Sequence, residues 1–285
     1  MPGFPRGAAL LPLLFLSPRQ APQAPRLLDR CNLDPAAAVS VELPRYVTEA
    51  SGLATTAEGR LLTHGDDLGR VAELDSATLQ PVGELRLRSA PRADFEGIAV
   101  VPGGVVLMTS EGILYFLGEK DGESGDGFDQ YGFERVDTGF GRVCELEGLA
   151  YDAASGVLLL PCKVAIDPRL ENAFIIFRWS LERRAPAQPD QIFASRSRIA
   201  RLVRTTQFRA TSVEWDAVSG HVLVLSSRPA VIVELAGDGS VVGAVALDPR
   251  RHPQAEGLTL VGNRLLIADE GVNKRGTITA YTCGP

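Results

Sequence analysis

Three glutamates and two serines stand at equivalent positions in a short pattern that recurs along the chain. In each copy an acidic or small residue, usually followed by glycine, leads into alternating apolar residues. The residues that open the five copies are Ser51, Glu96, Glu147, Ser212 and Glu256. Copies arranged around one axis would bring these side chains to a common centre. Converging carboxylates repel one another and lose hydration, so they require raised pKa values, water or a bound cation.

A cation among these carboxylates is the first chemical interpretation. Hard oxygen ligands favour Ca2+, or Mg2+ with retained waters, over zinc or copper. The predicted metal ligands are Glu96, Glu147, Glu256 and Asp269, the last of which follows an apolar stretch near the C-terminus. An alternative interpretation is that the glutamates accept hydrogen bonds from neighbouring backbone N–H groups and do no chemistry. The sequence leaves both interpretations open.

The residues that follow each opening residue predict the strands and turns that hold the opening residue in position. A turn rich in Gly, Pro or Asn comes first, and then a second strand that is almost continuously apolar, as expected for strands covered on both faces. These second strands are predicted at residues 61–64, 105–109, 157–160, 221–225 and 264–268. Third strands follow in step, whereas the fourth strands are weaker. Four-stranded units that repeat in this way predict an all-β fold, a five-bladed β-propeller.

The two ends of the chain are predicted to close this ring of blades. The last copy has only three strands, and residues 38–43 offer a spare strand near the N-terminus. An N-terminal strand that completes the last blade removes an exposed sheet edge. We therefore expect a single β-propeller domain over residues 26–285, with its N-terminal strand closing the last blade.

A rim of polar residues is expected at the mouth of the channel, because hairpin pairing places the end of each second strand beside the opening residues. The predicted ligand rim consists of Ser51, Asp67, Glu111, Lys163, Ser212, Arg228 and Glu270. His64 and Asp66 are the candidate catalytic residues on this face. Glycine follows the opening residue in four copies, which suits a position where backbones crowd the axis, and Val213 is the exception.

The four cysteines can be placed on the same scheme. Cys31 and Cys283 would lie beside each other in the closing blade, and a hairpin would bring Cys144 near Cys162. Two disulfides are therefore expected in an exported protein, and four buried free thiols are the alternative. There is no CxxC motif and the three histidines are scattered, which argues against a Cys/His metal site.

The first 25 residues are interpreted as a signal peptide or disordered leader. Arg6 gives a positive start, residues 7–16 are mainly apolar, and residues 17–25 are polar and rich in proline. The apolar run is too short to span a bilayer, and no other stretch resembles a transmembrane helix. The protein is expected to be periplasmic or secreted. A frayed apolar N-terminus on a cytoplasmic protein is the alternative.

Charge limits the partners of the protein. The formal net charge of -6 argues against nucleic acid as a partner, since phosphate binding needs a basic face. One basic run, residues 196–209, holds five arginines and is interpreted as a solvated helix or loop. We expect a monomer with no membrane span.

Four segments resemble the SdiA-regulated family of bacterial propellers. They are residues 95–97, 146–151, 223–227 and 253–258, and the similarity spans roughly residues 40 to 285. The resemblance implies a five-bladed propeller, distantly similar to NHL-repeat proteins, with calcium bound on the channel and no established activity. It places the family's acidic positions at Glu96, Glu147 and Glu256, and at Asp269 or Glu270. The chain departs from the family at Val213, where similar proteins tend to have glycine.

These observations leave three functions open. The first is a calcium-dependent binding module that holds a small molecule, glycan or protein at the channel mouth. The second is a metal-dependent hydrolase, a lactonase, esterase or phosphoesterase, in which the channel metal acts as Lewis acid and His64 beside Asp66 is the candidate base. The sequence has no GxSxG elbow. The third is a purely structural or protein-interaction propeller, in which the glutamates are incidental.

Overall fold

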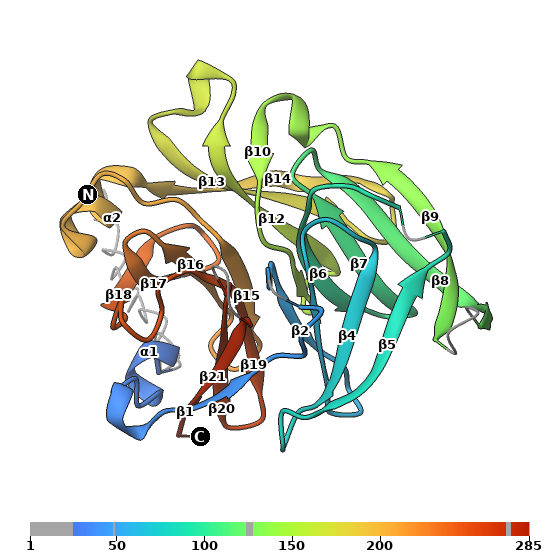
Figure 1. Cartoon of the computed structure of the whole chain (residues 1–285). Helices are drawn as coiled ribbons and strands as arrows, with labels where there is room; N and C mark the ends of the chain where they lie inside the picture. The colour runs from blue at the N-terminus through green and yellow to red at the C-terminus, as the bar shows by residue number, and fades with distance from the viewer. Residues whose placement is uncertain (1–24, 48, 90, 124–127, 272–274, 285) are drawn as a thin grey trace, which may run out of the picture.

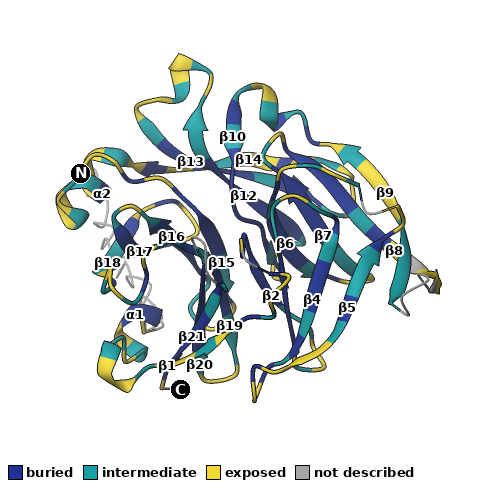
Figure 2. Cartoon of the chain, viewed as in Figure 1, coloured by how far each residue is buried: buried dark blue, intermediate teal, exposed yellow. Residues whose placement is uncertain are grey.

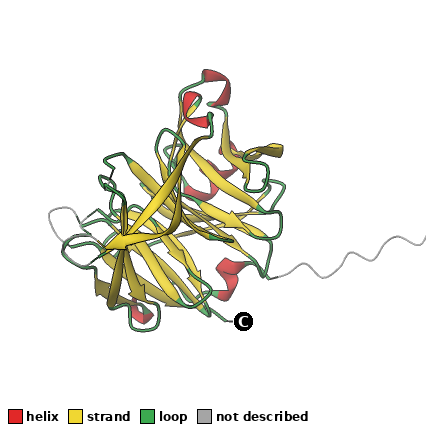
Figure 3. Cartoon of the chain, turned by 90° about the vertical axis from the view of Figure 1, so that its right-hand side faces the viewer, coloured by secondary structure: helices red, strands yellow, loops and turns green. Residues whose placement is uncertain are grey.

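The computed structural model describes residues 25–47, 49–89, 91–123, 128–271 and 275–284. This part of the chain is built mainly from antiparallel strands, with short helices at the edges of the β structure (Figures 1 and 3). None of its helices has the length and apolar character needed to cross a membrane. The predicted leader lies outside the described residues, apart from Pro25.

The largest sheet in the described chain has eight strands and joins two antiparallel units through the parallel pair β5–β9. Its strands are β2 (Leu53–Thr55), β3 (Arg60–His64), β4 (Arg70–Asp75), β5 (Pro81–Leu87), β6 (Phe95–Val101), β7 (Gly104–Thr109), β8 (Ile113–Glu123) and β9 (Asp129–Asp137). The chain runs through β2–β5 and then through β6–β9, so the sheet contains the first two copies of the repeated pattern.

Three further sheets contain the other copies. In the first, β10 and β11 both pair with β12, and its strands are β10 (Cys144–Leu146), β11 (Ala150–Asp152), β12 (Val157–Ala165), β13 (Ala173–Ser180) and β14 (Ala185–Ser195). The second holds β15 (Ser212–Asp216), β16 (His221–Ser227), β17 (Ala230–Leu235) and β18 (Val241–Ala246). The third holds β19 (Ala255–Val261), β20 (Arg264–Asp269), β21 (Thr277–Thr282) and β1 (Val39–Glu42). The five second strands expected from the sequence are therefore confirmed.

Short helical segments precede the first strand or lie between strands. They are α1 (Leu27–Arg30), α2 (Arg196–Val203) and the 3-10 turns η1 (Pro35–Ala37), η2 (Phe140–Arg142) and η3 (Pro168–Leu170). Helix α2 begins at the N-cap Ser195, whose side chain accepts a hydrogen bond from the backbone N–H of Arg198. It therefore starts directly where β14 ends.

The first strands of the copies contact one another in a closed cycle. β2 contacts β6, β6 contacts β11, β11 contacts β15, β15 contacts β19, and β19 contacts β2 again. Figure 1 shows β2, β6, β15 and β19 towards the middle of the molecule, with β9 and β18 on opposite outer sides. Residues far apart in the sequence therefore meet at a common centre.

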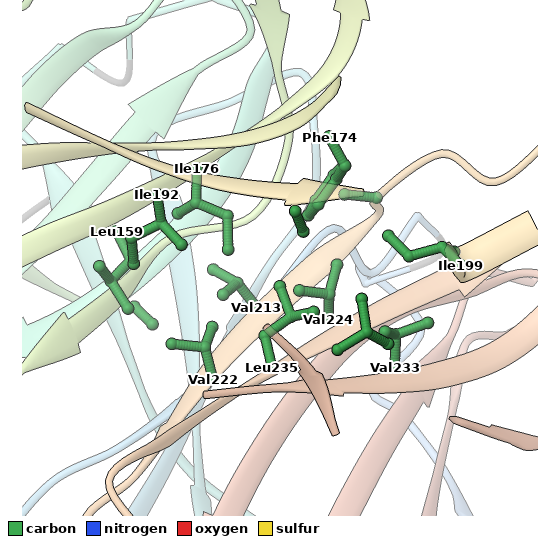
Figure 4. Packing of buried hydrophobic residues seen from close by; sticks show 14 of the residues in the cluster. Leu159, Phe174, Ile176, Ile192, Ile199, Val213, Val222, Val224, Val233 and Leu235 are labelled. Atoms are coloured by element: carbon green, nitrogen blue, oxygen red, sulfur yellow. The ribbon is translucent and has the colours of Figure 1, made fainter. Parts of the chain in front are cut away.

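Apolar side chains fill the spaces between neighbouring sheets. One cluster joins Phe174 and Ile176 of β13 to Val213, Val224 and other residues of β15–β17, all of them almost inaccessible to solvent (Figure 4). Buried residues run along the strands, whereas exposed ones gather in the connections (Figure 2). Strands covered on both faces explain why the second strands read as continuous apolar runs.

The N-terminal segment closes the structure as expected. β1 pairs antiparallel with β21, with Val39 opposite Ala280, and a disulfide joins Cys31 to Cys283. The second disulfide joins Cys144 to Cys162. Both predicted disulfides are confirmed. Helix α1 is also bonded to the sheet formed by β15–β18. The buried carboxylate of Glu234 in β17 accepts hydrogen bonds from the backbone N–H groups of Leu27 and Leu28, at 2.9 and 3.1 Å.

Glycine after the opening residue lets neighbouring first strands approach closely. Gly148 has φ +87°, and a Cβ atom placed on it would lie 2.7 Å from the Cα atom of Ser212 in the next sheet. Its backbone N–H also donates to the carbonyl oxygen of Glu96, at 2.6 Å. The crowding inferred from the sequence is confirmed at this position.

We expect Gly148→Ala to lower the free energy of unfolding by about 3 kcal/mol, because it combines left-handed backbone strain with overpacking. Gly156→Ala is the matched control: Gly156 also has a positive φ, +68°, but nothing lies within 4 Å of its added Cβ. That control should lose only about 1 kcal/mol. Urea unfolding measures both, and equal losses would show that crowding between the first strands contributes nothing.

Candidate functional site

Three glutamates from different sheets, here called the ring glutamates, lie at the same end of the first strands. Glu96 is in β6, Glu147 lies between β10 and β11, and Glu256 is in β19. Ser51 and Ser212, the other opening residues, are buried. The structure therefore gathers the glutamates as the repeated pattern predicted.

A β-bulge sets the direction of two ring glutamates. The residues on either side of Glu96 are opposite consecutive residues of β7, so Glu96 is an extra residue without a partner in the ladder. Glu256 has the same place in β19 against β20. A bulge bends the strand and re-aims the side chain of the extra residue. At these two Glu-Gly steps the bulge therefore interrupts the regular alternation of side chains between the two faces of the sheet and redirects the glutamate side chain.

The ring glutamates hold protons strongly. Burial raises the pKa of Glu96 to about 8 and the pKa of Glu256 to about 9, and the charge of Glu147 adds to both shifts. Burial also raises the pKa of Glu147 to about 7, although Lys163 opposes the shift. Their mutual influence places the three carboxylates in one electrostatic cluster.

Lys163 of β12 already compensates one of these carboxylates. Its ammonium group contacts the carboxylate of Glu147 and lies 3.6 Å from Oε1 of Glu145. Burial lowers the pKa of Lys163, but Glu147 and Glu96 outweigh it, so the pKa is raised overall. Glu147, itself buried, is thus part of an ion pair with the partly exposed Lys163, which makes it less available to a metal than the sequence suggested.

Glu256 is instead paired with a second acid, Glu270, and we call these two residues the acidic pair. The charge of Glu270 helps to raise the pKa of Glu256, and the pKa of Glu270 is itself raised, first by burial and then by Asp66. The Nε2 atom of Gln254 lies 3.2 Å from Oε1 of Glu256 and also contacts Glu270. The side-chain amide of Gln254 thus bridges the two carboxyl groups. Gln254 was not singled out in the sequence.

Asp269, a predicted metal ligand, faces a different set of partners. Its Oδ2 atom lies 2.7 Å from Nδ1 of His252, and Nε2 of His252 lies 2.6 Å from the hydroxyl of Tyr281. All three residues are buried. The structure therefore places Glu270, rather than Asp269, beside Glu256.

The candidate base His64 is enclosed in the core. Its side chain is fully buried, its Nδ1 atom lies 2.9 Å from the carbonyl oxygen of Gly65, and burial lowers its pKa to about 4. A Cβ on Gly52 would lie 2.8 Å from its Nε2 atom, so the ring fills the space beside β2. The structure does not bring the imidazole together with Asp66 as an acid–base pair.

Asp66 interacts through its charge with the other acidic residues near the channel mouth. Burial raises its pKa to about 6, and the neighbouring carboxyl of Glu49 raises it further through charge and a hydrogen bond. Asp66 in turn raises the pKa of Glu96 and of Glu270. It therefore lies on the same side of the channel as the acidic pair, and Glu49 is an additional acid that the repeat did not reveal.

The other predicted rim residues differ in their surroundings. Asp67 is exposed and forms an ion pair with Arg92 at 3.3 Å, and Glu111 is exposed in the turn between β7 and β8. The hydroxyl of Ser51 lies 3.3 Å from the carbonyl oxygen of Glu49. None of these three lines the large cavity described next.

A cavity of about 760 Å3, here called the mouth pocket, opens beside the ring glutamates. The charged residues in its lining include Glu147, Lys163, Arg196, Arg209, Arg228 and Glu256. Residues 196–209 were interpreted as a solvated helix or loop. The helix is present as α2 and four of the five arginines are exposed, which confirms that interpretation, and Arg196 and Arg209 in addition line the pocket. The apolar Ile199 and Phe208 inside the run were the signal that it packs against the core.

The donor set can be compared with the needs of a metal ion. Within the described ranges, no three or more His, Cys, Asp or Glu side chains are grouped so as to hold one ion. The acidic pair supplies two carboxylates, and Gln254 supplies an amide whose oxygen and nitrogen can exchange places by a flip. Oxygen donors of this kind suit a hard cation such as Ca2+.

Comparison with known proteins gives matches among solved structures. No protein-family model and no curated protein matches the chain. The glutaminyl cyclase of Myxococcus xanthus aligns over 87% of this chain and 98% of its own, with 14% identity and a TM-score of 0.54. The PQQ-bound aldose sugar dehydrogenase of Streptomyces coelicolor aligns over 87% of this chain and 99% of its own, with 12% identity and a TM-score of 0.52. At these identities the likeness shows the fold alone, and this chain has a β-propeller-like fold.

Proposed function

We propose that the protein is an exported five-bladed β-propeller that binds Ca2+ and a small molecule at one mouth of its central channel. The blade count is supported by the closed cycle of contacts among β2, β6, β11, β15 and β19. It is also supported by the pairing of β1 with β21, which gives the last unit its fourth strand. The resemblance to the SdiA-regulated family supports the same architecture.

The acidic pair carries the proposal for the cation. Glu256 and Glu270 are bridged by Gln254, and burial and neighbouring carboxylates raise the pKa of both, with Glu96 acting on Glu256 and Asp66 on Glu270. A divalent cation bound there would compensate the charge of both carboxylates. When bound, Ca2+ would supply positive charge that keeps these acids ionised and can hold an oxygen atom of a ligand. Glu270 and Gln254 would thus join Glu256 as ligands, whereas Glu147 stays with Lys163.

The mouth pocket favours a small molecule over a glycan or protein as the bound partner. Its volume of about 760 Å3 falls within the range of about 300–1,000 Å3 that is typical of small-molecule sites. Both signs of charge occur in its lining, which suits a polar ligand. The burial of His64, the candidate base of a hydrolase, supports our proposal of binding rather than hydrolysis.

Export is supported by the two disulfides, since such bonds persist in oxidising compartments. We therefore propose that the mature protein is periplasmic or secreted and that residues 1–25 serve as its signal peptide. The ligand would then be a molecule of that compartment.

Thermal unfolding with and without Ca2+ tests the proposed function. At a Ca2+ concentration about 100 times the Kd, binding should stabilise the wild type by about 2.7 kcal/mol, or roughly 5–10 °C in Tm. Glu256→Gln and Glu270→Gln should each remove at least half of this shift, because each deletes one anionic ligand. Glu58→Gln, in the exposed turn between β2 and β3, is the control and should keep the full shift. The absence of a shift in the wild type, or its persistence in both acidic-pair variants, would reject the calcium site.

A further inference from the structure

Charge is distributed unequally around the channel mouth. Four of the repeated units bring carboxylates to this end: Asp66, Glu96, Glu147 and the acidic pair. The unit that begins with β15 opens instead with Ser212 and Val213. In this sector the mouth pocket is lined by arginines, which come from the start of α2, from the segment before β15 and from the end of β16. They are Arg196, Arg209 and Arg228.

Two of these arginines, Arg196 and Arg209, line the pocket close enough to interact through their charges, and Glu171 is a further carboxylate of the lining. Burial lowers the pKa of Arg196, and the positive charge of Arg209 lowers it further, so the two guanidinium groups repel each other. The Nε atom of Arg196 donates to the carbonyl oxygen of Ala173 at 2.8 Å, and within the described ranges its other N–H groups make no hydrogen bond. By contrast, Lys163 is already compensated by Glu147.

The segment that carries these arginines is fixed to the core on both sides. Ile199 and Phe208 are almost fully buried between two sheets, and the ring of Phe208 packs edge-on against Phe174 with centroids 5.3 Å apart. The close-up in Figure 4 shows Ile199 and Phe174 facing this shared core. At the far end, the hydroxyl of Thr211 donates to the carbonyl oxygen of Ala255 at 2.7 Å. Because Arg209 directly follows Phe208, its backbone is held in place before a ligand arrives, which lowers the entropy cost of binding.

We infer that the small molecule in the mouth pocket carries an oxyanion, a carboxylate or phosphate group, and that Arg196 and Arg209 hold it. Guanidinium groups present N–H donors in a planar fork that matches such oxygens, and an anion between them relieves their mutual repulsion. The rest of the molecule would extend through the pocket towards Glu256, which also lines it. The inference rests on the proposed function, because it names the ligand class of the same pocket.

Calorimetric titration of the metal-free protein with inorganic phosphate, and separately with acetate, tests the inference. The wild type should bind at least one of them saturably, and the stronger of the two identifies the oxyanion. Arg209→Gln and Arg196→Gln should each weaken that binding about tenfold or more, as expected when a charge-assisted hydrogen bond is lost. The control is Arg201→Gln, which removes the same charge from an exposed position on α2 outside the pocket lining. It should stay within about twofold of the wild type.

Three results would overturn the inference. They are no saturable binding of either anion, unchanged binding in both pocket variants, and an equal loss in the Arg201→Gln control. The calcium shift in Tm, measured on the same variants, separates this inference from the proposed function. A wild type that shows the calcium shift without binding either anion would refute the inference alone. A wild type that binds an anion without a calcium shift would refute the cation site alone.

Discussion

The Cys31→Ala/Cys283→Ala double variant is expected to lose about 5 kcal/mol in its free energy of unfolding, on the chain-entropy model. The bond joins residues 252 positions apart, so it confines nearly the whole described chain in the unfolded state. It also fixes the segment that leads to β1, the strand that pairs with β21. Urea unfolding measures the loss, and the m value should rise because the unfolded chain becomes more extended.

The Cys144→Ala/Cys162→Ala variant is the matched control for loop length. Its cysteines are only 18 positions apart, so the same model gives about 3 kcal/mol. A larger loss from this pair than from Cys31 and Cys283 would show that the terminal bond does not close the ring energetically.

The metal-free protein is expected to become less stable as the pH rises from about 5 to about 9. Folding raises the pKa of Glu96, Glu147 and Glu256 from 4.5 to about 8, 7 and 9, chiefly through burial. An acid whose pKa is raised by folding stabilises the folded state fully below its unfolded pKa, and this contribution is lost as the pH rises through the folded pKa. The slope can approach about 1.4 kcal/mol per pH unit for each proton lost. We expect Tm to fall by at least roughly 5 °C across this interval.

Thermal unfolding in EDTA at a series of pH values checks this expectation. Glu256→Gln should flatten the dependence, because it removes the carboxyl with the highest of the three pKa values, whereas Glu58→Gln should leave it unchanged. Saturating Ca2+ should also flatten the curve by stabilising the ionised carboxylates. A metal-free Tm that rises steadily from pH 5 to pH 9 would contradict the clustering of the ring glutamates.

The repeated pattern made the fold accessible to prediction from the sequence. Continuous apolar runs such as residues 221–225 reflect strands covered on both faces, and tight turns mark their ends. The last copy lacks a fourth strand, and residues 38–43 offer a strand that no other copy needs, so we predict that the two pair. That pairing placed Cys31 beside Cys283, and the structure contains this bond.

The partners of each carboxylate could not be predicted in the same way. Asp269 and Glu270 are adjacent, and neighbouring residues at a strand end point to opposite sides. One of them therefore meets His252 and the other meets Glu256. The sequence pattern identifies the pair but does not say which face each residue takes, because the bulge at Glu256 shifts the local register.

The basic run illustrates a second limit of the sequence. Arg196 and Arg209 line the pocket, whereas Arg201 lies outside its lining, although all three stand in the same run. Their difference depends on how Ile199 and Phe208 pack between two sheets that are distant in sequence. Local charge counts carry no information about such packing.

The location of a bound cation tests the central claim most directly. Crystals grown with Ca2+, or with Tb3+ in its place, should give an anomalous peak at about 2.3–2.6 Å from carboxylate oxygens of Glu256 and Glu270. The peak should vanish in Glu270→Gln and persist in Glu58→Gln. A peak held only by other residues, or no peak at this mouth of the channel at saturating Ca2+, would contradict the account.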